Sequence, residues 1–153
     1  MVHRDIGGAD LPAPPSVVFA ALTNADARAA WMPPSGMTGH FEWFDVRPGG
    51  GYRMVLAYDD PAHPGKTEAN TDVTDVRFVA VDPPHRIVEE VDFVSDDPQY
   101  AGTMTMTWSL ESAPFGTRVS IIADNVPDGI SSADHATAFA ATLANLKHHV
   151  SGG

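Results

Sequence analysis

The middle of the chain alternates between apolar and polar positions with a period of two, which is typical of half-buried strands. The clearest case is Thr103 to Leu110, where Met104, Met106 and Trp108 share one face and hydroxyl side chains occupy the other. Similar segments are separated by turn sequences, and the expected strands are Val2–Leu11, His40–Arg47, Tyr52–Tyr58, Thr71–Val81, Arg86–Phe93, Thr103–Glu111 and Thr117–Ala123. Successive strands joined by short turns predict an antiparallel meander. The polar segment Asp59–Asn70 is expected to form a mobile loop.

Helical patterns flank the strand region. Prolines precede Ser16–Leu22, which predicts a short helix, and Asn24 is a good N-cap for a second helix through Trp31. Ser132–Val150 predicts a longer helix with one stripe of buried positions, namely His135, Phe139, Thr142, Leu143, Leu146 and Val150. This helix would span ~28 Å at ~1.5 Å per residue, about the length of a nine-residue strand. We therefore expect it to lie along the sheet, which makes the fold class α+β.

The length of 153 residues suits one domain covering 1–153. Nine Lys and Arg against 20 Asp and Glu give a net charge of −11, which disfavours nucleic acid and membrane surfaces as partners. The chain has no Cys, which excludes disulfides, thiolate metal sites and thiol nucleophiles. The N-terminus lacks the apolar core of a signal peptide, and no apolar run approaches ~20 residues, so a cytoplasmic protein is expected.

Motifs for metal, phosphate or acyl-transfer chemistry are incomplete in this sequence. Gly65-Lys66-Thr67 resembles the end of a P-loop, but Asp60 stands where the earlier glycine is needed. His148 and His149 point about 100° apart on a helix, so they cannot chelate one metal in the usual i, i+4 way. We therefore expect no metal and no cofactor.

The order strand, two short helices, six strands and a long helix resembles the SRPBCC superfamily, which has the START-like (helix-grip) fold. Within it the chain is similar to the activator-of-heat-shock-protein-90-ATPase-homologue family. The stretches that carry this resemblance are Pro14-Pro15-Ser16-Val17-Val18-Phe19-Ala20-Ala21-Leu22-Thr23, Trp31-Met32-Pro33-Pro34, Pro48-Gly49-Gly50-Gly51-Tyr52-Arg53-Met54, Pro83-Pro84-His85-Arg86-Ile87-Val88, Thr107-Trp108-Ser109-Leu110 and Gly116-Thr117-Arg118-Val119. Members often carry Gly before an aromatic residue in the last helix, and here the pair is Ala138-Phe139.

The resemblance implies a curved antiparallel sheet of about seven strands, two short helices, and a long C-terminal helix with a cavity beneath it. We expect a small hydrophobic ligand in that cavity, and homodimers are common among such domains. The expected ligand-binding residues are Met54, Tyr58, Met104, Met106, Trp108 and Phe139, with Glu89 and His135 as polar anchors.

Each of these residues also has a structural interpretation. The Met104, Met106 and Trp108 face is also explained by core packing, because apolar strand faces are buried by default. Glu89 shares a face with apolar residues, where a carboxylate needs a partner, and Arg53 and Arg77 are candidates. A histidine in the first turn of a helix, such as His135, is often at the surface.

Three functions remain open on sequence grounds. The first is binding of a small hydrophobic molecule. The second is an enzyme resembling polyketide cyclases or hydrolases, with Glu89 or His135 as acid or base. The third is an interaction module that regulates a chaperone ATPase in a stress response, as the family name suggests.

Overall fold

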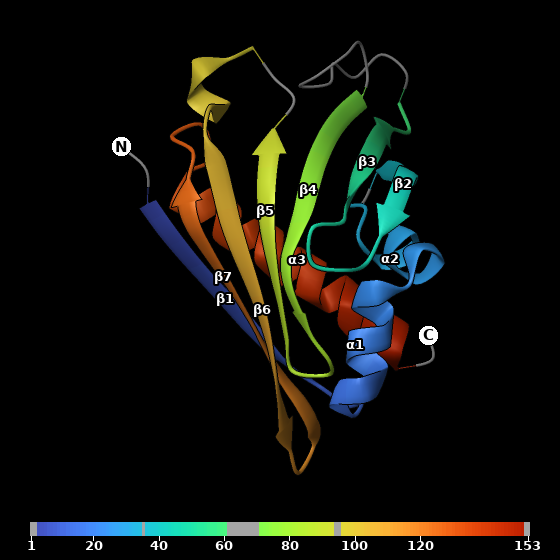
Figure 1. The fold of residues 1–153 in the computed structure, drawn as a ribbon. Helices are drawn as coiled ribbons and strands as arrows, with labels where there is room; N and C mark the ends of the chain where they lie inside the picture. Colours follow the sequence, from blue (N-terminus) through green and yellow to red (C-terminus); the bar gives the residue numbers. More distant parts are fainter. Residues whose placement is uncertain (1–2, 35, 61–70, 94–95, 152–153) are drawn as a thin grey trace.

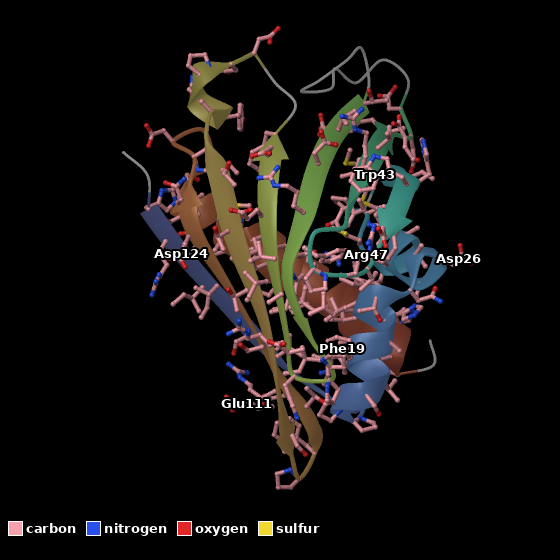
Figure 2. All side chains as sticks on the ribbon, viewed as in Figure 1. Phe19, Asp26, Trp43, Arg47, Glu111 and Asp124 are labelled. Atoms are coloured by element: carbon pink, nitrogen blue, oxygen red, sulfur yellow. The ribbon has the colours of Figure 1, made fainter. Side chains whose placement is uncertain are left out.

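The described strands form one seven-stranded antiparallel sheet with the order β1-β7-β6-β5-β4-β3-β2 (Figure 1). The computed structural model describes residues 3–34, 36–60, 71–93 and 96–151. The strands are β1 (His3–Leu11), β2 (Met37–Asp45), β3 (Gly51–Tyr58), β4 (Thr71–Asp82), β5 (Arg86–Phe93), β6 (Thr103–Ala113) and β7 (Gly116–Val126). The helices are α1 (Pro15–Thr23), α2 (Ala25–Trp31), the short 3₁₀ helix η1 (Pro98–Tyr100) and α3 (Ser132–Val150).

The long helix α3 crosses one face of the sheet, and α1 and α2 lie near its C-terminal end (Figure 1). The two short helices connect β1 to β2, which lie at opposite edges of the sheet. This arrangement is the α+β helix-grip fold expected from the sequence. The predicted meander from β2 to β7 is confirmed, because each of these strands pairs with the next in chain order.

The predicted starts of α2 and α3 are confirmed by their caps, whereas α1 begins at Pro15, one residue before the predicted Ser16, and has no side-chain cap. The Asn24 side chain accepts a hydrogen bond from the backbone N–H of Ala27 at 2.9 Å. The Ser131 hydroxyl accepts one from the N–H of Asp134 at 3.1 Å. Each bond satisfies a backbone donor that has no partner within the first helical turn. Of the predicted loop Asp59–Asn70, residues 61–70 lie outside the described part of the chain.

The core lies between the sheet and the helices. On β6, Met104, Trp108 and Leu110 are at most 4% exposed, as the alternating pattern predicted. The stripe on α3 buries His135, Phe139, Leu143 and Leu146.

The helix α3 packs most closely on β1. A Cβ atom at Gly7 of β1 would lie 2.9 Å from the Cβ atom of Phe139, so only glycine permits this approach. Because α3 packs tightly on β1 at one edge of the sheet, the open space beneath the helix lies over β3, β4, β5 and β6.

Candidate functional site

A cavity of about 450 Å³ lies between the sheet and α3. This volume falls within the range of ligand pockets, which is roughly 300–1,000 Å³. The apolar residues that line it are Met32, Pro34, Leu56, Val73, Val76, Val91, Phe93, Met104, Met106, Ile121, Ile130, Ala138 and Phe139. Polar side chains interrupt this surface, namely Arg28, Tyr52, Asp72, Thr74, Glu89, Tyr100, Asp134, His135 and Thr142.

Five of the eight residues expected to bind a ligand line this cavity: Glu89, Met104, Met106, His135 and Phe139. They come from β5, β6 and α3, so the fold brings together segments far apart in the sequence. The other three, Met54, Tyr58 and Trp108, do not line it.

Each of these three side chains makes its contacts outside the cavity. Met54 is 1% exposed, and its methyl group would lie 2.8 Å from a Cβ atom at Gly39, so it packs toward the edge strand β2. The Tyr58 hydroxyl bonds to Asp72 at 3.2 Å, near the end of β3. Trp108 is turned away from the open space and packs edge-on against Trp31, with ring centroids 6.0 Å apart.

A buried ion pair joins α2 to the centre of the sheet. The Nη2 atom of Arg28 donates to both carboxylate oxygens of Glu89, at 3.1 and 2.9 Å, and both side chains are about 1% exposed. The Nη1 atom of Arg28 donates to the backbone carbonyl of Leu22 at 3.1 Å. A buried charge is tolerated only when it is paired and hydrogen-bonded, and both conditions hold here.

The partner of Glu89 is Arg28, and neither Arg53 nor Arg77, the two candidates from the sequence, contacts it. Arg53 instead binds Asp75 at 2.6 and 2.8 Å, and Arg77 binds Asp92. All four of these side chains are at least 28% exposed and belong to the outer surface of the sheet, whereas Glu89 faces the core. The alternation along β5 explains the difference, because Glu89 shares the inner face with Ile87 and Val91.

Two aromatic residues complete the cluster around this ion pair. The indole N–H of Trp108 donates to Oε1 of Glu89 at 2.9 Å, and the Tyr52 hydroxyl accepts from Nη2 of Arg28 at 3.1 Å. The Arg28 guanidinium also lies 4.8 Å from the centre of the Tyr52 ring, within cation–π range. We refer to Arg28, Tyr52, Glu89 and Trp108 as the inner cluster.

Burial keeps Tyr52 protonated, and the ion pair with Glu89 keeps Arg28 charged. Burial raises the pKa of the Tyr52 hydroxyl, so this group keeps its proton at neutral pH. Burial alone would lower the pKa of Arg28, but the adjacent Glu89 charge outweighs this effect and the pKa is raised. The cluster therefore contains one permanent cation and one donor hydroxyl.

Sequence reasoning missed Arg28 as a site residue, although a signal for it exists. Arg28 lies three residues before Trp31 and four before Met32, so all three fall on one side of a helix. Trp31 is buried at 2% exposed, which carries Arg28 into the interior with it. A lone Arg on the apolar side of an alanine-rich helix is the pattern that would have marked it.

A second polar group lies at the start of α3. The Nδ1 atom of His135 lies 2.6 Å from Oδ2 of Asp5 on β1, and Nε2 of His3 lies 3.0 Å from the same oxygen. His135 is 8% exposed and its ring packs on Phe139, with centroids 4.1 Å apart. Its position is therefore an inward-facing one, in contrast to the surface position that sequence reasoning also considered.

Asp5 is held in its ionised form by these neighbours. Burial alone would raise its pKa, but hydrogen bonds from Ser132 and His135, together with favourable electrostatic interactions with the His3 and His135 rings, outweigh burial. The pKa of Asp5 therefore lies below its ordinary value of 3.8.

This shift predicts a pH-dependent contribution to stability. A carboxyl group with a lowered folded-state pKa stabilises the fold above its unfolded-state value, and this stabilisation is lost as the pH falls through the folded-state pKa. Near neutral pH, Asp5→Asn should lower the free energy of unfolding by about 1.5–3 kcal/mol, as expected for a charged hydrogen bond. Urea unfolding of both proteins over a pH series should show this difference shrinking below pH 3.8. A difference that stays constant over the series would contradict the assignment.

Within the part of the chain that the structure describes, no group of three or more His, Asp or Glu side chains could hold a metal ion. Over the same residues, no helix is both long enough and apolar enough to cross a membrane.

The geometry defines a class of protein: a helix-grip fold with a cavity between the sheet and the C-terminal helix. The chain belongs to the family described as activator of Hsp90 ATPase homolog 1-like protein, whose model matches residues 12–151. No curated protein matches the chain.

Solved structures share this fold over nearly the whole chain. A protein from Chromobacterium violaceum is 26% identical, with a TM-score of 0.85, and the match covers 96% of each chain. A protein from Rhodobacter sphaeroides is 20% identical, with a TM-score of 0.78, and covers 98% of this chain and 99% of its own. A solution structure from Arthrobacter aurescens is 15% identical, with a TM-score of 0.82, and covers 98% and 87%.

Proposed function

We propose that this protein binds a small hydrophobic molecule in the cavity between the sheet and α3. The observation that carries this proposal is a cavity of about 450 Å³ whose wall is mainly apolar and includes Arg28, Tyr52 and Glu89 of the inner cluster. Binding pockets combine a mostly apolar surface with a few polar groups that orient the ligand, and this wall has both features.

The size of the cavity supports the proposal. Protein interiors are packed to crystal-like density and contain few voids larger than a water molecule. The space of about 450 Å³ is partly open to solvent and reaches fully buried side chains such as Tyr52 and Glu89, so it is far larger than the gaps that imperfect core packing leaves.

The flexible part of the wall also suits a ligand. Met32, Met104 and Met106 contribute to the lining from α2 and β6. Methionine side chains are unbranched and polarisable, and they adapt to ligands of different shape.

Thermal unfolding with diphenylhexatriene, an uncharged hydrocarbon dye, tests this function. At a free dye concentration of ~100 times the dissociation constant, binding should stabilise the fold by about 2.7 kcal/mol. For a domain of this size this raises the melting temperature by roughly 5–10 °C. The dye should also become fluorescent on binding. An unchanged melting temperature with dim fluorescence at every dye concentration would refute binding.

A further inference from the structure

Arg28 and Tyr52 of the inner cluster line the cavity, and each has a hydrogen-bond donor without an acceptor among the described residues. The Tyr52 hydroxyl uses a lone pair to accept from Arg28, and its own proton has no acceptor among the described residues. The Nη1 atom of Arg28 carries two N–H bonds, and within the same residues only the Leu22 carbonyl accepts from it. Both side chains line the cavity, so this end offers donors to a ligand.

The inner cluster carries no net charge. The Arg28 cation is compensated by the Glu89 carboxylate, which contacts it through both oxygens. A ligand carboxylate at this end would lie near Glu89, and a ligand ammonium would lie near Arg28. The complementary group is therefore an uncharged acceptor, such as a carbonyl oxygen.

The Asp5–His135 pair presents the opposite hydrogen-bonding character. The ionised carboxylate of Asp5 can only accept, so Nδ1 of His135 donates to it, and the imidazole tautomer that fits this bond has its proton on Nδ1. This leaves a lone pair on Nε2, which has no hydrogen-bond partner among the residues that the structure describes. His135 is more than nine-tenths buried and lines the cavity, so its complementary group is a ligand donor.

The two polar groups lie toward different ends of the cavity. Glu89 is on β5 and Asp5 is on β1, and these strands are separated by β6 and β7. Three strand spacings of ~4.8 Å place the two groups on the order of 14 Å apart across the sheet. The wall between them is apolar and includes Met104, Met106 and Phe139.

We propose that the ligand is an uncharged, elongated apolar molecule with a carbonyl oxygen at one end and a hydroxyl group at the other. The carbonyl oxygen accepts from Tyr52 and Arg28, and the hydroxyl group donates to Nε2 of His135. Asp5 is a positioning residue that holds the His135 ring and its tautomer. This inference rests on the proposed function and names the class of ligand for the same cavity.

Binding of methyl ketones with a para-hydroxyphenyl group at the far end of a straight alkyl spacer tests this class. The spacer is lengthened one carbon at a time, since the distance between the two groups selects one length. Each ketone is compared with its methyl ether, which cannot donate, and with the alkyl phenol that lacks the carbonyl. At the best length, wild-type protein should prefer the phenolic ketone over each analogue by roughly three- to tenfold, the value of one hydrogen bond.

Two variants test the carbonyl-binding end and the hydroxyl-binding end of the cavity separately. Tyr52→Phe should reduce the preference for the carbonyl and keep the preference for the hydroxyl. His135→Phe retains a ring beside Phe139. This variant should lose the preference for the hydroxyl and keep the preference for the carbonyl. Diphenylhexatriene has no polar atoms, so its retained binding shows that a variant keeps its cavity. If either variant loses this binding, it is replaced by His135→Leu or Tyr52→Leu, which also lack the polar group.

The outcomes distinguish this inference from the proposed function. If diphenylhexatriene binds but no spacer length gives both preferences, the ligand class is wrong and the hydrophobic-binding function stands. Loss of the same preference in both variants also overturns the assignment of the two ends. If neither the dye nor any ketone binds wild-type protein, both proposals fail.

Discussion

Replacing Glu89 with glutamine is expected to lower the free energy of unfolding by about 3–5 kcal/mol. The substitution removes the carboxylate charge and leaves the Arg28 guanidinium buried without a counter-ion, while changing the size of the side chain very little. Arg28 is about 1% exposed, so water screens its uncompensated charge poorly. Urea unfolding monitored by tryptophan fluorescence measures the change.

A neighbouring residue supplies the control for this experiment. Glu90 lies next to Glu89 on β5 but faces outward, with its side chain 40% exposed and 3.6 Å from Arg77. Glu90→Gln should change stability by at most about 1 kcal/mol, because exposed ion pairs contribute little.

The double variant Arg28→Met/Glu89→Gln tests the cause. It removes both charges, and the glutamine oxygen can still accept from the Trp108 indole. We expect it to be more stable than Glu89→Gln alone, because no uncompensated charge remains. Equal destabilisation by Glu89→Gln and Glu90→Gln would contradict the buried ion pair.

Replacing Ala138 with tryptophan is expected to weaken diphenylhexatriene binding by about 100-fold, or about 2.7 kcal/mol. Ala138 lines the cavity from α3, so a large side chain there occupies the space that the ligand needs. Ala138 is itself exposed, so the added ring displaces no packed core residue. The fold should therefore remain intact while binding is lost.

Ala136→Trp is the matched control. Ala136 lies on the same helix, is exposed, and does not line the cavity. Two residues along a helix point about 200° apart, so the same side chain is directed away from the ligand. Fluorescence titration should give wild-type affinity for Ala136→Trp, and similar affinities for the two variants would argue against binding in this cavity.

The helices and strands were predictable from the sequence because each is determined by a local pattern of apolar positions or by a capping residue. The alternation from Met104 to Leu110 and the stripe from His135 to Leu146 each repeat with the period of one structure. Caps at Asn24 and Ser131 then fix where helices begin.

The site was less predictable because it depends on contacts between distant segments. Arg28 and Glu89 are 61 positions apart, and Asp5 and His135 are 130 apart, so no local pattern pairs them. Tyr52 and Met54 lie two positions apart on β3 and are both buried, yet Tyr52 lines the cavity and Met54 does not. That difference depends on which part of the inner face is covered, which a period of two does not determine.

The most direct test of the account is whether a ligand contacts the cavity methionines. In protein labelled with ¹³C at the methionine methyl groups, we expect intermolecular nuclear Overhauser effects from bound diphenylhexatriene to Met104 and Met106, and none to Met37 on the edge strand β2. Effects that are confined to Met37, or absent from Met104 and Met106 at saturating dye, would contradict a ligand bound between the sheet and α3.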